Sequence, residues 1–166
     1  IDGSWCLPFN LGFGVVTETS VEVVYESPFH AISGFQFDIS GASVGALGSG
    51  GAAGDAGFDV SSNGSTVLGF SLTGAVIDAG AGVLTVLDVD YSAAGSACLS
   101  GAVIADGNFN NINNIVLGDC VELPCVDEDG DATCDHADDC VGSYDCADVC
   151  NGEAFLDDCG ECSGGQ

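Results

Sequence analysis

The chain has 166 residues, with 26 acidic side chains and no lysine or arginine, so its formal net charge at pH 7 is −26. Nucleic acid and anionic membrane are therefore excluded as direct partners, since both bind cationic surfaces, and phosphate-handling enzymes, which usually need Lys or Arg, are disfavoured. Hydrophobic residues still make up 46% of the chain, so a folded core is expected, with divalent cations as counter-charge.

Cysteine usage indicates an oxidising compartment. An even number of cysteines in an acidic chain, without signs of an intracellular cofactor, is typical of secreted proteins held by disulfides. Up to five disulfides are expected among Cys6, Cys98, Cys120, Cys125, Cys134, Cys140, Cys146, Cys150, Cys159 and Cys162. No run of about 18 apolar residues is present, so no membrane span is predicted. The chain starts at Ile1 without a visible signal peptide, so either processing removed one or the chain is a segment of a longer polypeptide. Its end inside a repeated pattern favours truncation or excision. We expect a secreted or cell-surface location.

Residues 1–16 are strongly apolar and lack the alternation of a half-buried strand. They include Trp5, Cys6 and Pro8 and few polar side chains. Two interpretations are open. The segment is either a first strand that folds over the domain and is held through Cys6, or an apolar arm that docks onto a neighbouring copy by strand addition. The second interpretation implies a homo-oligomer or filament.

The next segments predict strands with one buried face. Residues 15–26 are rich in β-branched side chains with glutamates on the opposite face, and residues 32–40 alternate between apolar and polar positions. The side chains expected to share the buried faces are Val21, Val23, Tyr25, Phe35, Phe37 and Ile39.

A glycine-rich stretch at 45–57 is predicted to be a turning surface loop, because no lysine follows the glycines to form a phosphate-binding loop. A hairpin is expected after it, with its turn at Asn63. Leu68, Phe70 and Leu72 share one face of the second hairpin strand. Asn63 also begins an Asn-Gly-Ser sequon and is a candidate glycosylation site. Further strands are expected over 82–91, 98–106 and 114–123.

Eight to ten short strands, separated by Gly, Ser, Asn and Asp turns and without a convincing amphipathic helix, predict an all-β fold for residues 1–122: an antiparallel two-sheet sandwich. The segments GFQFDISG and STVLGFSLTGAVIDAGAGVLTVL resemble the cohesins and related carbohydrate-module jelly rolls of secreted bacterial proteins. The resemblance covers about residues 20–105. Cohesins bind a partner module called dockerin through one sheet face, so it implies a jelly roll and a binding module, without assigning functional residues.

One loop of this domain has the residue spacing of a metal-binding loop. Asp106, Asn108 and Asn110 place oxygen-bearing side chains at alternate positions, as at the opening of a calcium loop. No acidic closing residue follows until Asp119. An asparagine-rich turn is therefore the favoured interpretation.

Composition changes at Leu123, and residues 123–166 form the predicted second region. They hold 13 of the 26 acidic residues and seven of the ten cysteines. Carboxylates at this density repel one another, so order is expected to come from a bound cation and from disulfides. An all-oxygen set favours calcium over zinc or copper. The expected calcium ligands are Asp127, Asp129, Asp131, Asp135, Asp138 and Asp139.

The pattern D-x-D-G-D-x-x-C-D-x-x-D-D-C in this stretch resembles the thrombospondin type 3 repeat, which implies that these aspartates bind calcium and that the cysteines pair with one another. Residues 145–165 contain an imperfect repeat that aligns Asp145-Cys146 with Asp158-Cys159, and are similar to tandem cysteine repeats of large secreted bacterial surface proteins. A second set of candidate ligands comprises Asp145, Asp148, Asp157, Asp158, Asp106, Asn108 and Asn110.

A zinc site is the alternative for the tail cysteines, because Cys159 and Cys162 form a C-x-x-C pair near Cys146 and Cys150. The surrounding carboxylates and glycine turns favour disulfides. The odd number of tail cysteines then implies that at least one pairs with a cysteine of the first region or of another chain.

The sequence does not favour an enzyme. His30 and His136 have no adjacent nucleophile motif, and a carboxylate pair of the glycosidase type would arise by accident among 26 acids.

Two non-enzymatic functions remain. The preferred one is a subunit of a calcium-stabilised extracellular fibre or surface assembly, joined through the N-terminal arm and the tail, since packed acidic subunits need calcium as counter-charge. The alternative is a cohesin-like binding or adhesion module of a larger secreted protein, which recognises a carbohydrate or a partner domain. Carbohydrate sites usually expose aromatic rings, and the phenylalanines are expected to be buried.

Overall fold

The computed structural model describes residues 7–164, and residues 1–6 and 165–166 lie outside the described range. By its internal contacts the chain divides into two compact units. The first is formed by Ile1–Tyr91 and Gly95–Pro124, and the second by Ser92–Ala94 and Cys125–Gln166.

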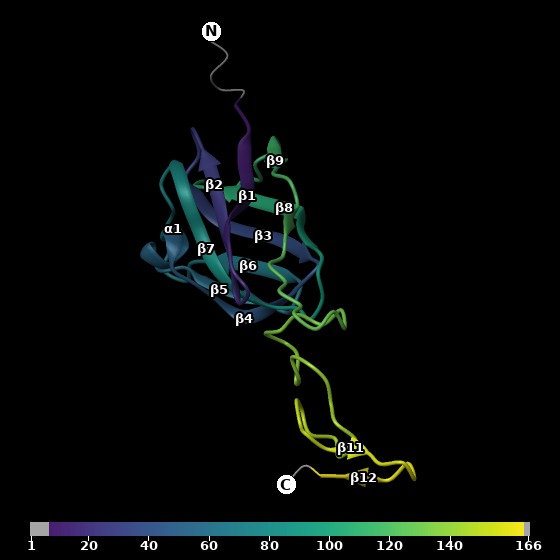
Figure 1. The fold of residues 1–166 in the computed structure, drawn as a ribbon. Coiled ribbons are helices and arrows are strands. Elements are labelled where there is room, and N and C mark those ends of the chain that lie inside the picture. Colours follow the sequence, from purple (N-terminus) through teal and green to yellow (C-terminus); the bar gives the residue numbers. More distant parts are fainter. Residues whose placement is uncertain (1–6, 165–166) are drawn as a thin grey trace. The chain divides into compact units, whose positions relative to one another are not determined.

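The first unit is a curled β-sheet with one short helix (Figure 1). Its ten strands are hydrogen-bonded in the order β10-β8-β3-β6-β5-β4-β7-β2-β1-β9. In chain order its elements are β1 (Phe9–Val16), β2 (Ser20–Ser27), β3 (Ile32–Ser40), β4 (Ser43–Ser49), α1 (Gly51–Asp55), β5 (Asp59–Ser62), β6 (Thr66–Phe70), β7 (Gly80–Asp90), β8 (Ser96–Asp106), β9 (Ile115–Leu117) and β10 (Val121–Glu122).

The sheet folds into two layers because β4 belongs to both. Ser43 and Val44 pair with β7, whereas Leu47 pairs with Ser61 of β5. After a register shift between Val44 and Gly48, the pairing with β7 continues at Gly48 and Ser49, so β4 is paired with both layers. The first layer is β9-β1-β2-β7-β4 and the second is β4-β5-β6-β3-β8-β10. This architecture confirms the predicted all-β jelly-roll sandwich.

One pairing departs from the expected antiparallel pattern. β9 runs parallel to β1, with Phe9 opposite Ile115 and Leu11 opposite Leu117. The connection between β8 and β9 returns the chain to the end of the sheet where β1 begins, and Phe9 N–H donates to the carbonyl oxygen of Asn114 at 2.8 Å. β9 therefore enters beside β1 in the same direction.

The core contains the residues that strand alternation predicts. All six expected side chains are buried: Val21, Val23, Tyr25, Phe35, Phe37 and Ile39. Phe35 stacks on Phe37 with ring centroids 6.0 Å apart and on Phe58 at 6.1 Å. Aromatic pairs at such separations add about 0.5–1.5 kcal/mol beyond the burial of their area.

The glycine-rich stretch at 45–57 is regular structure, so the expected surface loop is wrong. It completes β4 and forms the short helix α1. Ala53 is fully buried, and a Cβ atom at Gly51 would lie 2.6 Å from the carbonyl oxygen of Leu84. The absence of a side chain thus lets the chain approach β7 closely, a tertiary requirement that local composition does not reveal.

Part of the apolar N-terminal segment is a strand of the sandwich. Residues 9–16 form β1, between β2 and β9, and Phe9 and Leu11 are buried. These residues follow the first-strand interpretation. Trp5 and Cys6, on which the arm and the covalent tether depend, lie outside the described residues.

The second unit has little regular structure. β11 (Phe155–Leu156) and β12 (Cys162–Ser163) pair as a small antiparallel hairpin. Within its described residues only Cys134 and Cys140 are buried. Disulfides and aspartate hydrogen bonds therefore take the place of a hydrophobic core. Across residues 7–164, no helix is both long and apolar enough to cross a membrane.

Candidate functional site

The outer face of the second layer carries a row of side chains across five strands. Its directly paired members are Val103 on β8, Gln36 on β3, Leu68 on β6, Ser61 on β5 and Leu47 on β4. Residues opposite one another in antiparallel strands point to the same side of the sheet. The row is open to solvent, because Val103 is 46% exposed, Leu68 is 42% exposed and Leu47 is 72% exposed.

A second row lies beside the first. It consists of Ala105, Gly34, Phe70 and Asp59 on β8, β3, β6 and β5, and Phe70 is 37% exposed. Contiguous exposed apolar side chains on a folded protein mark interaction surfaces. These two rows define a candidate docking face.

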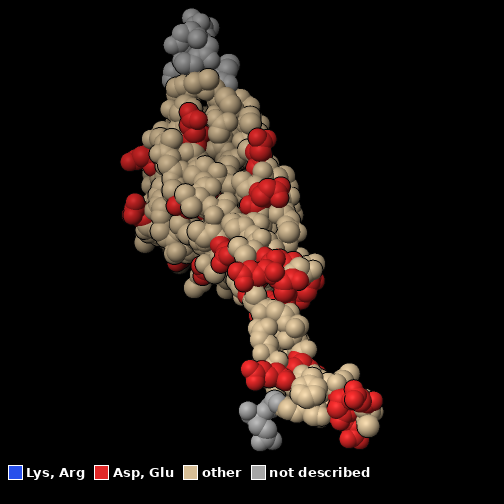
Figure 2. Space-filling view, in the orientation of Figure 1, with Lys and Arg blue, Asp and Glu red and all other residues tan. Residues whose placement is uncertain are grey.

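Acidic and hydroxyl groups border the docking face. Thr66 Oγ1 donates a hydrogen bond of 2.6 Å to Asp38 Oδ1. β8 bulges next to this carboxylate at Gly101, which has a φ of 60°. Figure 2 shows acidic side chains spread over the visible surface without any basic ones. The charges that the face offers to a partner are therefore negative.

Alternation places Leu68 and Phe70 on one face of β6, as expected, but that face points to solvent. The core positions of β6 are Val67 and Gly69, and the space above the glycine holds the ring of Phe35. A glycine inside a strand is the sequence signal that identifies the buried face here. The expectation of buried phenylalanines is wrong for Phe70, Phe109 and Phe155.

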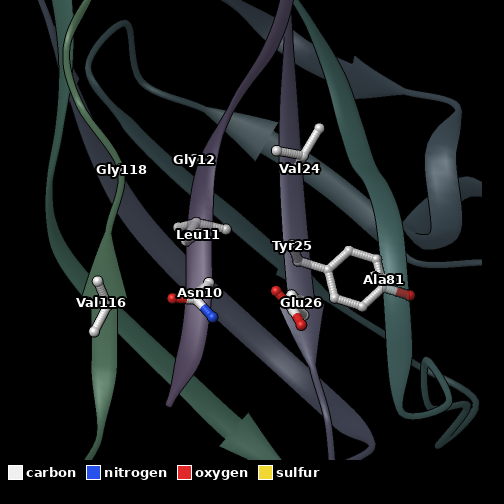
Figure 3. A pocket seen from close by; sticks show the side chains of 9 residues that line it. All are labelled: Asn10, Leu11, Gly12, Val24, Tyr25, Glu26, Ala81, Val116 and Gly118. Carbon is white, nitrogen blue, oxygen red and sulfur yellow. The ribbon is translucent and has the colours of Figure 1, made fainter. Parts of the chain in front are cut away.

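The outer face of the first layer has a hollow of about 300 Å³ between β9, β1, β2 and β7 (Figure 3). Gly12 and Gly118 leave it open, and they lie so close that a Cβ atom at Gly118 would be 3.2 Å from the Cα atom of Gly12. Its polar side chains are those of Tyr25 and of the paired Asn10 and Glu26. Such a hollow accommodates a small apolar group beside a carboxylate.

In the second unit, three of the six expected calcium ligands lie together. Carboxylate oxygens of Asp127, Asp129 and Asp131 are within 4.8 Å of one another. The Gly130 N–H donates to Asp127 Oδ1 at 2.7 Å. The pKa of the Asp129 carboxyl is lowered, chiefly by a hydrogen bond from the Gly142 N–H. Backbone amides thus hold Asp127 and Asp129 in place and favour the charged form of Asp129.

The other three expected ligands do not belong to this group of three. Asp135 Oδ1 accepts a hydrogen bond from the Glu128 N–H at 3.0 Å, and Asp138 Oδ1 accepts one from the Cys140 N–H at 2.8 Å. Asp138 Oδ2 is buried and has no hydrogen-bond partner among the described residues. A buried carboxylate oxygen is costly unless something compensates its charge.

Three aspartates of the second candidate set begin turns with the same hydrogen-bond pattern. The turns span Asp106–Asn110, Asp145–Val149 and Asp157–Glu161. Each aspartate Oδ1 accepts hydrogen bonds from the N–H groups two and four positions later. Each aspartate N–H donates to the carbonyl oxygen four positions later, and the residue three positions later has a positive φ. Each turn connects two paired residues of a hairpin. In this structure the three carboxylates stabilise turns.

These turns also correct the expected alignment of the tail repeat. The sequence aligns Asp145 with Asp158, whereas in the structure Asp145 and Asp157 occupy the same position of the turn. Cys150 and Cys162 then follow at equal spacing. The repeated element is therefore an aspartate-capped hairpin, which cysteine spacing alone does not reveal.

Acid is expected to open the two tail turns. The backbone N–H of Val149 lowers the pKa of Asp145, and that of Glu161 lowers the pKa of Asp157. The stability from these bonds is therefore present above the unfolded carboxyl pKa of about 3.9 and is lost as pH falls through the lower folded values. Amide hydrogen exchange at Val149 and Glu161 should accelerate, relative to sandwich amides, between about pH 4 and 2. Unchanged relative protection over this range would contradict the role of the carboxylates.

The described cysteines form four disulfides, Cys98–Cys120, Cys125–Cys134, Cys140–Cys150 and Cys146–Cys162. The alternative of a zinc site is excluded, because three of its four cysteines are in disulfides. Cys159, which the sequence places in a disulfide, is unpaired and exposed. Cys6 lies outside the described residues. The tail pairs are all internal, so the expected link from the tail to Cys98 or Cys120 is absent.

The hairpin around Asn63 is confirmed, because β5 and β6 pair antiparallel on either side of it. Asn63 is exposed, and its Oδ1 accepts a hydrogen bond from the Thr66 N–H at 2.9 Å. Glycosylation of Asn63 stays a prediction.

Comparison with protein-family models and with curated protein sequences finds no match. Among solved structures, a type I cohesin–dockerin complex from Clostridium thermocellum aligns with a TM-score of 0.52 and 17% identity, over 72% of this chain and 95% of that chain. A non-cellulosomal cohesin from the hyperthermophilic archaeon Archaeoglobus fulgidus aligns with a TM-score of 0.49 and 14% identity, over 71% and 92%. The first alignment shows a cohesin-like fold.

Proposed function

We propose that the chain is a non-enzymatic extracellular module that binds a dockerin-type protein partner on the docking face. The observation that carries this proposal is the exposed apolar row that includes Val103, Leu68 and Leu47. The row crosses five strands, and its three apolar members lie on β8, β6 and β4. A partner that covers these side chains gains their burial.

The partner should combine apolar anchors with basic residues at the rim. The docking face presents Asp59 and is bordered by Asp38, and the chain has no Lys or Arg to pair with them. A partner carboxylate would meet only like charge here, whereas Lys or Arg would find a complementary potential. Charge complementarity therefore selects a partner with a basic rim.

An extracellular location agrees with the four disulfides, since such bonds persist in oxidising compartments. The cohesin-like fold also supports, in general terms, the proposal of a module that binds a protein partner. In the matched complex the partner of the cohesin is a dockerin.

For the second unit we propose calcium binding at Asp127, Asp129 and Asp131. Their convergent oxygens support the proposal, because calcium prefers oxygen ligands with this charge. The uncompensated Asp138 Oδ2 is a further oxygen in the same unit that a cation would satisfy. Calcium bound here would reduce repulsion among the tail carboxylates and would have a structural role.

The fibre-subunit hypothesis is the weaker candidate. Its N-terminal arm overlaps residues 9–16, which form β1 and contribute Phe9 and Leu11 to the core of their own sandwich. Packing of like subunits would also bring together surfaces of net charge −26. Calcium-dependent filaments in electron micrographs of the purified chain would favour the fibre instead.

Binding should be measured by calorimetry against a panel of dockerin modules, including the one from the matched complex. At least one should bind, and Leu68→Ala or Phe70→Ala should weaken its binding about 30-fold, since a central anchor contributes about 2 kcal/mol or more. Val15→Ala is the matched control, because Val15 is exposed on β1 in the other layer. Equal losses in all three variants, or no binding across the panel, would refute the proposal.

A further inference from the structure

Two hollows lie side by side at one end of the first unit and share a ridge made of His30 and Asp106. One, of about 390 Å³, is lined by the ridge together with Leu7, Asn111, Ile112, Asn113 and Asn114. The other, of about 330 Å³, is lined by the ridge together with Phe29, Ala31, Val76, Gly107 and Asn108. Each hollow therefore combines polar side chains with an apolar patch.

Buried serine hydroxyls fix the backbone of the ridge. Ser27 is fully buried, and its Oγ donates to the carbonyl oxygen of His30 at 2.5 Å. Ser33 is also buried, and its Oγ donates to the carbonyl oxygen of Asp106 at 2.6 Å. Both ridge residues are thus held at fixed places, which lowers the entropy cost of binding a ligand between them.

The loop that lines both hollows contains five asparagines within residues 106–114. Its main chain is ordered by the Asp106 turn and by a hydrogen bond from the Ile112 N–H to the Ile104 carbonyl oxygen at 2.8 Å. The turn holds Phe109 at a φ of 65°, an unusual conformation for a bulky residue. Phe109 is nevertheless 75% exposed. The strained backbone therefore presents an aromatic ring to solvent and does not serve the core.

The chemistry of the ridge and its loop selects an uncharged, hydroxyl-rich ligand. Asparagine amides both donate and accept hydrogen bonds, and a carboxylate accepts from hydroxyl groups. An anionic ligand finds no Lys or Arg anywhere in the chain. We propose that this end of the sandwich is a binding site for a neutral oligosaccharide, with His30, Asp106 and the loop asparagines as its polar contacts and Phe109 as an exposed platform.

This site adjoins the docking face, because Asn111 pairs with Ala105, but none of the residues that line the two hollows belongs to the docking face. The test is an array of neutral and acidic oligosaccharides, followed by calorimetry of the full chain with the best neutral one. Phe109→Gly and Asn113→Ala should each weaken binding about tenfold or more. Gly at position 109 relieves the positive φ, so a loss of binding with unchanged or higher thermal stability separates loss of the ring from loss of the fold. Val15→Ala should bind like the unmodified chain.

Three outcomes would overturn the proposal. They are no binding of any neutral oligosaccharide at millimolar concentration, equal affinity of Phe109→Gly, Asn113→Ala and the unmodified chain, and a preference for acidic sugars. A lysine-rich peptide that competes for the same site and binds more tightly would identify a peptide-binding surface instead. Dockerin binding is measured separately, so failure of either proposal leaves the other testable.

Discussion

Substitution of Gly69 by alanine is expected to destabilise the sandwich by about 1–3 kcal/mol, the cost of overpacking a filled core. Gly69 is the cross-strand partner of Phe35, and a Cβ atom placed there would lie only 2.1 Å from Cζ of the Phe35 ring. The ring cannot move freely, because it stacks against Phe37 and Phe58. The midpoint of urea unfolding, followed by far-UV circular dichroism, measures this loss of stability.

Two comparisons make this prediction specific. Gly54→Ala in α1 has no atom within 4 Å of the new Cβ and should be neutral or slightly stabilising. The double variant Gly69→Ala with Phe35→Leu should be more stable than the sum of the two single losses predicts, because a smaller side chain relieves the clash. If the stability losses of Gly69→Ala and Phe35→Leu simply add, or if alanine at Gly54 and at Gly69 has the same effect, the Phe35 ring does not need the space that Gly69 leaves.

The sandwich was predictable where strand alternation is clean. Phe35, Phe37 and Ile39 repeat with period two, and such a period allows only one buried face. β6 has the same period, but Leu68 and Phe70 point outward because Gly69 faces the core opposite Phe35. Hydrophobicity alone therefore assigns the wrong face to a strand whose large apolar side chains are exposed to solvent.

Other features depend on contacts between distant residues. The helix α1 in the glycine-rich stretch forms because close approach to Leu84 requires glycine at position 51. In the tail, composition predicts disulfides correctly, and three of the six expected calcium ligands, Asp127, Asp129 and Asp131, converge. It does not separate these from Asp145 and Asp157, which also accept hydrogen bonds from backbone N–H groups but belong to no such group of carboxylates among the described residues. Ligand and turn roles call for the same residue type.

The second candidate site, at the ridge of His30 and Asp106, illustrates a further limit. Asp106 and its neighbours resemble a calcium loop in sequence, yet Asp106 Oδ1 accepts hydrogen bonds from the N–H groups of Asn108 and Asn110. These bonds lower the pKa of Asp106, and the bond from the Asn110 N–H has the larger effect. Its position beside His30 arises from the packing of β8 against β3, which no local pattern contains.

Calcium is expected to stabilise the second unit strongly. At a free calcium concentration one hundred times the dissociation constant, binding to the folded state alone contributes about 2.7 kcal/mol. This is a large effect for a unit whose residues up to 164 include just two buried ones, Cys134 and Cys140. Calorimetry should detect at least one site at millimolar calcium, and amide exchange at Gly130 and Gly142 should slow when calcium is added.

Asp131→Asn tests the ligand role without removing the local fold, because the amide oxygen can still accept the hydrogen bond from the Thr133 N–H. Loss of one charged ligand should weaken calcium binding at least about tenfold. Asp88→Asn is the matched control, since Asp88 is exposed on β7 of the sandwich. If the chain binds no calcium, or if both variants bind it equally, the carboxylates at 127–131 act only through backbone hydrogen bonds. The tail would then be ordered by its disulfides and its aspartate-capped turns alone.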